Sequence, residues 1–315
     1  MSGTFNNPIV NGAPDPWMLK HTDGFYYFMM TLRDRIELWR SQSMTEISDG
    51  EKKVIWMPTG GDYGFNLWAP ELHRIQDCWY VYFTANDGGV DETRRICVIS
   101  NKSDNPMEGQ WEWHGPMKTE RAGLDGTVME LRGELYFFYA GYGQFPQYGS
   151  AIFIVRMKDP CTLIGEEAML TAPTLEWEQQ GGMAINEGPV ILQRNGRIYL
   201  VYSASTTWSE DYCLGMLTMQ LSADPMVPLS WSKSPTPVFH KSEENHIYAT
   251  GHNCFTVSPD GLEDWIVYHA LPYPGADVSK RSMYLQKFVW NPDGAPLFGM
   301  PAAEDIRLPS GGRHG

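Results

Sequence analysis

The chain has 315 residues, and 38 Asp and Glu against 24 Lys and Arg give a formal net charge of −14. This balance, without a basic cluster, excludes nucleic acid and anionic membranes as partners, because both would be repelled. No window approaches the roughly 18 consecutive apolar residues of a membrane-spanning helix, and five scattered cysteines without CxxC spacing predict neither a disulfide framework nor a zinc site.

The first ten residues, MSGTFNNPIV, lack the basic and apolar segments of a signal peptide. The chain as written is therefore expected to be cytoplasmic, and secreted if a signal peptide has been removed. Lys52-Lys53 and Arg94-Arg95 are isolated cationic pairs, which we interpret as solvated surface.

Composition favours strands over helices. Aromatic residues make up 13% of the chain, and it contains 31 Gly and 22 Pro. This mixture is typical of many short strands joined by tight turns, so the sequence predicts an all-β fold.

Five segments along the chain share one pattern: a polar residue, a short apolar strand, a polar or Gly-containing turn and an aromatic-rich strand. In chain order they are DPWMLKHTDGFYYFMM from Asp15, APELHRIQDCWYVYFTA from Ala69, DGTVMELRGELYFFYAG from Asp125, EGPVILQRNGRIYLVYSAS from Glu187 and HNCFTVSPDGLEDWIVYHA from His252. The turn residues are those that hairpins require. The second strands contain few polar residues, which predicts burial on both faces.

The polar residues that begin the repeats are Asp15, Glu71 (with Trp68 just before it), Asp125, Glu187 and His252, spaced 54 to 65 residues apart. A period near 50 residues is typical of propeller blades, which bury their faces only against neighbouring blades. The sequence therefore predicts a five-bladed β-propeller. We expect residues 1–315 to form one catalytic domain without a separate carbohydrate-binding module.

In a propeller, the residues that begin the inner strands meet at one rim of the central channel. Any single Asp beside Gly or Pro is most often a turn or capping residue. Asp15, Asp125 and Glu187 share one phase of the repeat, which favours a functional cluster, whereas Glu71 is equally compatible with a structural role.

Three carboxyl groups at one rim suit glycosidic bond hydrolysis. One protonates the leaving oxygen and a second acts on the attacking water or the anomeric centre. A third raises the pKa of the acid by like-charge repulsion. Placement on different blades leaves space for a water molecule, which favours inversion of configuration.

Five motifs in order resemble those of glycoside hydrolase family 43, most closely its α-L-arabinofuranosidase members, over almost the whole chain. They are NGAPDPW, NLWAPEL, GLDGTVME, INEGPVIL and GHNCFTVSPDG. The resemblance implies a five-bladed propeller and an inverting, exo-acting hydrolase. It also implies that Asp15 is the general base, Asp125 the carboxylate that tunes and orients the acid, and Glu187 the general acid.

The resemblance assigns two further residues. His252 corresponds to a histidine below the sugar site that often holds a structural calcium or sodium ion through itself and waters, although a lone histidine near a buried strand is more often a core residue. Arg281 corresponds to an arginine that reaches the substrate or a catalytic carboxylate. The sequence has no calcium-loop spacing, so we expect no cofactor in the chemistry.

Aromatic rings next to the rim would stack against a sugar. Trp17 follows Asp15-Pro16 and Trp68 precedes APEL, and these are the best candidates; Phe65 and Trp208 are further ones. The stretches GQFPQYGS and STTWSEDYC are expected to border the pocket.

The sequence thus predicts an α-L-arabinofuranosidase that releases terminal arabinose from arabinan, arabinoxylan or arabino-oligosaccharides, with plant cell-wall polysaccharide as its partner. A β-D-xylosidase, or an enzyme with both activities, is the main alternative, and an endo-arabinanase a weaker one. A non-catalytic propeller that binds polysaccharide is the alternative from another class.

Overall fold

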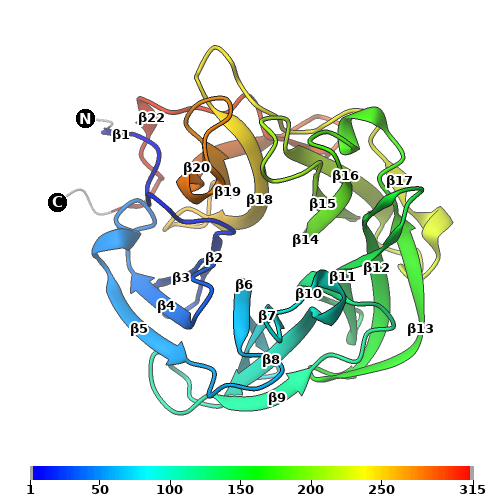
Figure 1. Ribbon diagram of the computed structural model, residues 1–315. Helices are drawn as coiled ribbons and strands as arrows, with labels where there is room; N and C mark the ends of the chain where they lie inside the picture. Colours follow the sequence, from blue (N-terminus) through cyan, green and yellow to red (C-terminus); the bar gives the residue numbers. More distant parts are fainter. Residues whose placement is uncertain (1–2, 313–315) are drawn as a thin grey trace.

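The computed structural model describes residues 3–312, and its regular structure is almost entirely strand. Five groups of four antiparallel strands, here called the first to fifth units, follow one another along the chain (Figure 1). Their strands are β2 (Trp17–Lys20), β3 (Tyr26–Met29), β4 (Ile36–Ser41) and β5 (Glu51–Trp56); β6 (Phe65–Ile75), β7 (Cys78–Asn86), β8 (Arg95–Asn101) and β9 (Glu112–Pro116); β10 (Gly123–Leu131), β11 (Glu134–Gln144), β12 (Tyr148–Asp159) and β13 (Thr162–Thr171); β14 (Ala184–Arg194), β15 (Arg197–Ala204), β16 (Cys213–Gln220) and β17 (Ser232–Lys233); and β18 (Tyr248–Val257), β19 (Asp264–Leu271), β20 (Ser282–Trp290) and β21 (Pro296–Leu297).

The units are arranged around a common centre, with the first strand of each unit innermost (Figure 1). These inner strands contact one another in sequence, from β2 to β6, β10, β14, β18 and back to β2. Within the described residues the only helical elements are five short 3₁₀ turns: η1 (Ile47–Asp49), η2 (Asp91–Thr93), η3 (Glu176–Glu178), η4 (Pro228–Ser230) and η5 (Val278–Lys280). The prediction of an all-β fold is confirmed.

The predicted hairpin turns lie between the first two strands of each unit. At three of them both central residues have positive φ: Gln76 and Asp77, Arg132 and Gly133, and Asn195 and Gly196. Positive φ at both central positions gives a turn whose twist matches that of the flanking strands. The Gly, Asn and Asp of these stretches therefore fix the strand pairing.

The second strands are buried, as predicted. All four residues of β3 are buried, and β15 has a single half-buried residue, Arg197, followed by seven buried ones. Their side chains fill the spaces between adjacent units; one apolar cluster, for example, combines Tyr27 and Leu38 of the first unit with Leu72 and Val81 of the second. Apolar burial between neighbours therefore holds the units together.

The junction between the third and fourth units differs from the others. Here β12 and β14 pair in parallel through Gly149 with Ala184 and Ser150 with Ile185, which joins the two units into one sheet of eight strands. A Cβ atom at Gly149 would lie on the carbonyl oxygen of Ala184. Glycine is therefore required for the two backbones to approach this closely.

The two ends of the described chain meet on the fifth unit. Strand β1 (Thr4–Phe5) pairs with β22 (Ile306–Arg307), and the side chain of Asn7 exchanges hydrogen bonds with the backbone of Leu285. These contacts tie the last unit to the segment that leads into the first. Over residues 3–312, no helix is long and apolar enough to cross a membrane.

Candidate functional site

At an equivalent position in each inner strand, or just before it, one residue has a positive φ. These residues are Asp15, Ala69, Asp125, Gly188 and His252. In the second to fifth units the strand register shifts at the same place. A bulge of this kind re-aims neighbouring side chains, so the backbone turns polar side chains towards one rim, as the repeat phase predicted.

In four of the five units, the backbone N–H of the positive-φ residue donates to a side chain of the preceding unit. The accepting side chain lies on the second strand of that unit or just after it. The acceptors are Oγ1 of Thr31 for Ala69, Oγ1 of Thr84 for Asp125, Oγ of Ser203 for His252 and Nδ1 of His269 for Asp15. At the fourth unit, the N–H of Gly188 donates instead to Oδ2 of Asp125, at 3.0 Å. The position on β11 that corresponds to Thr84 and Ser203 is Ala140, which has no acceptor.

A cavity of about 290 Å³ opens at this rim. Seven of the nine residues proposed from the sequence line this cavity: Asp15, Trp68, Asp125, Glu187, Trp208, His252 and Arg281. The rest of the lining is Thr31, Arg33, Asp91, Leu124, Tyr142, Met183, Ile185, Thr207 and Val278. Trp17 and Phe65 are outside this lining. The three predicted carboxyl groups therefore share one pocket.

Asp15 is held as a carboxylate by its partners. Nη1 of Arg281 donates to Oδ1 at 3.2 Å, and Oγ1 of Thr31 donates to Oδ2 at 2.7 Å. Burial opposes ionisation, but the Arg281 guanidinium, with His252 and His269 nearby, outweighs it and holds the pKa of Asp15 well below its ordinary value. Asp15 is therefore ionised and able to accept a proton.

Asp125 and Glu187 have the opposite electrostatics. Burial, the Glu187 charge and then the Asp15 charge raise the pKa of Asp125 well above its ordinary value. Burial, opposed by a hydrogen bond from Tyr212, raises the pKa of Glu187 to about 7. Glu187 is partly exposed to the cavity, whereas Asp125 is 2% exposed. The pair therefore holds a proton near neutral pH, and Glu187 is the member that can reach a ligand.

Two histidines lie beneath Asp15, and burial lowers the pKa of both. The pKa of His269 falls to about 4, and that of His252 also falls below its ordinary value. His269 accepts the N–H of Asp15 on Nδ1, so the neutral ring carries its proton on Nε2. The rings stack, with centroids 5.9 Å apart. Both act as neutral supports for the base.

Trp68 lines the cavity, but one face of its ring is covered. The guanidinium carbon of Arg94 lies 3.5 Å from the ring centroid, and Nε of Arg94 donates to Asp91 at 3.0 Å. Arg94 is only 6% exposed. The interpretation of Arg94 as solvated surface is therefore wrong, because cation–π stacking and the Asp91 carboxylate stabilise the buried charge. Nothing in the sequence pattern indicated this stack.

The other aromatic candidates separate into two groups. Trp208 is 54% exposed at the cavity rim, and its indole N–H donates to the carbonyl of Gly181. Trp17 packs between the first two units, where its N–H donates to the carbonyl of Leu72 and its ring contacts His73. Phe65 is 52% exposed and lies over Gly88. Of the four candidate rings, Trp68 and Trp208 are thus the two that line the cavity.

Sequence reasoning missed several residues around the carboxylates, above all Thr31, Tyr212 and His269. Thr31 and His269 occupy the polar positions near the ends of two aromatic second strands, FMMT and VYHA. That shared position is a signal that could have identified them. Tyr212 lies in the stretch STTWSEDYC, which was expected at the pocket, but nothing in its sequence points to Glu187.

Glu71, which was compatible with either role, is not part of the cavity lining. Its carboxylate is 4% exposed and lies 2.9 Å from Nε2 of His73. Its charge adds to those that raise the pKa of Asp125, as the last of five contributions. Glu71 therefore acts on the site at a distance.

Asp125, Glu187 and His252 could each offer a ligand atom to a cation, because these atoms lie within 4.8 Å of one another. Calcium takes about six to eight oxygen ligands, whereas this set supplies two carboxylate oxygens and one imidazole nitrogen. The residues therefore do not fit a resident calcium ion.

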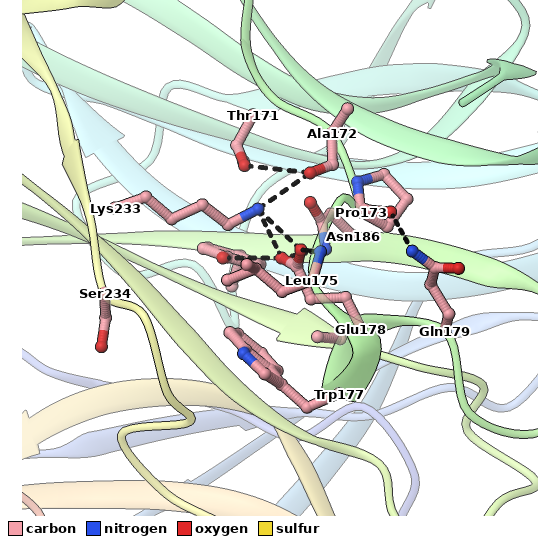
Figure 2. Close-up of polar contacts among 12 residues, drawn as sticks. Thr171, Ala172, Pro173, Leu175, Trp177, Glu178, Gln179, Asn186, Lys233 and Ser234 are labelled. Atoms are coloured by element: carbon pink, nitrogen blue, oxygen red, sulfur yellow. Dashed lines mark hydrogen bonds and ion pairs between the residues drawn. The ribbon is translucent and has the colours of Figure 1, made fainter. Parts of the chain in front are cut away.

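A second polar cluster lies behind Glu187. The carboxylate of Glu178 is fully buried and accepts from the backbone of Leu175, from Asn186 Nδ2 and from Tyr202. Lys233 Nζ completes the set, 2.7 Å from each carboxylate oxygen. Figure 2 shows Leu175, Asn186 and Lys233 around Glu178. The cluster anchors the segment that leads into β14, directly before Glu187.

A larger cavity, about 720 Å³, lies away from the carboxylates. It is bounded by residues 41–46, the end of β2 and residues 308–312, and among the described residues its only charged side chains are Lys20 and Glu46. It has no pair of carboxyl groups for acid and base roles, so the smaller cavity is the candidate active site.

Comparison with known proteins also indicates a glycoside hydrolase. The family model described as "Glycosyl hydrolases family 43" matches residues 5–296. The chain is similar to an "Extracellular exo-alpha-(1->5)-L-arabinofuranosidase" of Streptomyces chartreusis, with 43% identity over 85% of this chain and 83% of that protein.

A protein of the same name from Streptomyces avermitilis is 39% identical over 97% of this chain, which spans only 65% of that relative's length. Among solved structures, an "alpha-L-arabinofuranosidase from Lactobacillus brevis" superimposes with a TM-score of 0.90 and 36% identity. That match covers 95% of this chain and 97% of the other.

Proposed function

Because the chain belongs to glycosyl hydrolase family 43, we propose that it is an inverting, exo-acting α-L-arabinofuranosidase. Its substrates would be terminal arabinofuranosyl linkages in arabinan, arabinoxylan or arabino-oligosaccharides. The names of the similar Streptomyces and Lactobacillus proteins support this sugar specificity. The observation that carries the proposal is one pocket in which the pKa of Asp15 is lowered and that of Glu187 is raised.

These opposite pKa values support a division of roles. Glu187, protonated near neutral pH, is proposed as the general acid and the ionised Asp15 as the general base. Asp125 is proposed as the residue that tunes and orients the acid, since it accepts the N–H of Gly188, next to Glu187 in the chain. Asp15 comes from the first unit, away from the adjacent third and fourth units that carry the other two.

The proposed reaction is a single displacement. As the bond between the anomeric carbon and the leaving oxygen breaks, Glu187 transfers its proton to that oxygen. A water molecule attacks the anomeric carbon from the opposite face and gives its proton to Asp15. Arabinose is released with inverted configuration, as in family 43 generally, and proton exchange with solvent restores both groups.

The pocket supports exo action. A cavity of about 290 Å³ is at the lower limit of ligand sites, which suits one terminal sugar better than a continuous chain. We propose that Trp68 and Trp208 contact the sugar ring, and that His252 and Arg281 reach its hydroxyl groups. Trp17 and Phe65 are supported less well, because they lie outside the lining.

The fold is proposed to be a five-bladed β-propeller in a single catalytic domain. The ring of contacts from β2 through β18 and back supports this arrangement. The pairing of β1 with β22, which ties the fifth unit to the segment before the first, also supports it.

Family 43 enzymes need no cofactor for catalysis. A structural calcium or sodium ion would have to be held by His252 mainly through water molecules, because Asp125 and Glu187 are assigned to proton transfer. Incubation with a chelator should leave the rate unchanged, and a fall in the melting temperature would show that a calcium ion is present.

Two observations on location point in different directions. The Streptomyces relatives are named extracellular and the proposed substrate is a cell-wall polymer, which supports secretion. All five cysteines are free, which is typical of a reducing compartment. Fractionation of the producing cells with activity measurement distinguishes secreted from cytoplasmic enzyme.

Hydrolysis of a panel of aryl glycosides, linear and debranched arabinan and arabinoxylan tests the proposal. We expect release of arabinose alone, with the β anomer formed first in the proton NMR spectrum. Release of xylose would favour the β-xylosidase alternative, and internal cleavage of arabinan an endo-arabinanase. Binding without hydrolysis would favour a non-catalytic propeller.

A further inference from the structure

Tyr212 is the only described residue whose side chain donates a hydrogen bond to Glu187. The hydroxyl lies 2.8 Å from Oε1. Within residues 3–312 no donor contacts Oε2, and Glu187 lines the cavity. The two oxygens of this carboxyl group are therefore in different environments, one held by a phenol and one without a protein partner.

The phenol is held rigidly. Tyr212 is fully buried, and its ring stacks on His269 with centroids 5.5 Å apart and planes 11° apart. On β18, a Cβ atom at Gly251 would lie within the contact distance of the ring, so only glycine leaves space for it. Burial first, then the Glu187 charge, raises the pKa of Tyr212 well above its ordinary value. The hydroxyl thus remains a donor at working pH.

We propose that Tyr212 is a positioning residue that determines which oxygen of Glu187 carries the proton. A protonated carboxyl group accepts on its carbonyl oxygen and donates from the other. With Tyr212 donating to Oε1, the proton is on Oε2, the oxygen available to the leaving group. This inference rests on the proposed role of Glu187 and goes beyond it.

The same hydrogen bond strengthens during the reaction. When the proton leaves Oε2 for the leaving oxygen, negative charge develops on the carboxylate, and a bond to a charged acceptor is roughly twice as strong as a neutral one. Tyr212 therefore stabilises the transition state more than the ground state. Through its stack on His269, which accepts the N–H of Asp15, the same ring also fixes the acid relative to the base.

Other charged groups also act on Glu187, and the experiment must separate Tyr212 from them. Asp15 raises the pKa of Glu187 and Arg281 lowers it, while Asp125 and His252 place ligand atoms within 4.8 Å. None of these is changed by a substitution that removes only the phenol oxygen.

Tyr212→Phe retains the ring and its stack. We expect kcat to fall about ten- to hundredfold on arabino-oligosaccharides, with KM little changed. This is less than the roughly hundred- to thousandfold loss for a donor that contacts the reacting oxygen directly, because Tyr212 acts through Glu187. Across a series of aryl arabinofuranosides, the rate should depend more steeply on leaving-group pKa. The alkaline limb of the pH profile should move to higher pH, because the lost bond stabilised the ionised acid.

Replacement of Tyr212 by 3,5-difluorotyrosine keeps the fold and strengthens the donor. It should move the alkaline limb to lower pH, opposite to the Phe variant. Tyr199→Phe is the matched control, since Tyr199 is equally buried but donates to the carbonyl of Gly294. It should be less stable without any change in the pH profile or the leaving-group dependence.

An activity-free measurement separates this inference from the proposed function. In protein labelled with ¹³C at the Glu carboxyl carbons, the signal lost in Glu187→Gln identifies the residue. Its midpoint should rise in Tyr212→Phe even if arabinofuranosides prove not to be substrates. An unchanged midpoint, together with unchanged leaving-group dependence, would overturn the role of Tyr212.

Discussion

Asn186 and Glu187 are neighbours on β14, yet their side chains enter two very different polar clusters. On one side, Asn186 is one of four donors that surround the buried carboxylate of Glu178 (Figure 2). On the other, Glu187 shares a pocket with the carboxyl groups of Asp15 and Asp125 and accepts one hydrogen bond, from Tyr212. Burial is common to both clusters, so the difference lies in the partners.

The contrast separates a structural acid from a functional one. A buried carboxylate with a cation and several donors is compensated, and removal of one partner costs stability. Buried like charges without such partners shift their pKa values instead, which is costly for the fold and useful for proton transfer. Substitutions on the two sides should therefore change different properties, activity on one side and stability on the other.

The largest effect is expected on the pocket side, for Glu187→Gln. The amide cannot donate the proton, so kcat/KM on arabino-oligosaccharides should fall about a thousandfold. The loss should be much smaller on an aryl arabinofuranoside whose leaving group needs no proton. The melting temperature should not fall, because one of the repelling carboxyl groups has been removed. Kinetics on both substrates and thermal unfolding provide the measurements.

Asp15→Asn is the companion variant. Without the base, both classes of substrate should be hydrolysed slowly, since every turnover requires an activated water. A large recovery of Asp15→Asn on the activated aryl substrate would reverse the assignment of acid and base.

The next effect concerns Arg281, whose guanidinium lowers the pKa of Asp15 and of Glu187. In Arg281→Met both pKa values should rise. The base is then protonated at higher pH, so the acidic limb of the kcat/KM profile should move to higher pH, and the alkaline limb should move in the same direction. Lys280→Met, one position earlier and exposed, is the matched control and should leave both limbs in place. An acidic limb unmoved in Arg281→Met would remove Arg281 from the control of Asp15.

These pocket predictions depend on features that the sequence revealed to different degrees. The repeat phase identified Asp15, Asp125 and Glu187, because each is, or directly precedes, the positive-φ residue that recurs in every unit. It could not reveal Arg94 on Trp68, or Tyr212 on Glu187, since these pairs are separated by 26 and 25 positions and no periodicity links them. Nor could it separate Glu178 from Glu176, because the partner that decides between them, Lys233, comes 55 positions later.

On the structural side, Lys233→Met should leave Glu178 buried without its cation. We expect a loss of about 2 kcal/mol in unfolding free energy, below the value for fully buried pairs because Lys233 is partly exposed. Activity per folded molecule should stay within about twofold of the wild type. Adding Glu178→Gln to Lys233→Met should restore part of the stability, which a double-mutant cycle measures. A pH profile altered by Lys233→Met would show that the two clusters are not independent.

The smallest expected effect tests why Asp125 accepts the N–H of Gly188, the residue next to Glu187. Four units satisfy the N–H at the bulge with a Thr, Ser or His side chain, whereas the fourth uses Oδ2 of Asp125 because Ala140 offers no acceptor. In Ala140→Ser the new hydroxyl should compete for the N–H of Gly188. Asp125 then loses the one contact that lowers its pKa, so kcat/KM should fall by about tenfold or less.

Stability shows whether the new bond has formed. A buried hydroxyl without a partner costs about 1–3 kcal/mol, so an unchanged melting temperature with reduced activity means that the introduced hydroxyl has taken the N–H of Gly188. Thr84→Ala is the converse variant: it leaves the N–H of Asp125 unpaired and should lower stability by a similar amount. If Ala140→Ser were destabilised and yet fully active, the third and fourth units would be too far apart at this point for a side chain to replace Asp125. The contact of Asp125 with the N–H of Gly188 would then be a consequence of the parallel pairing of β12 with β14, and not of the missing acceptor at Ala140.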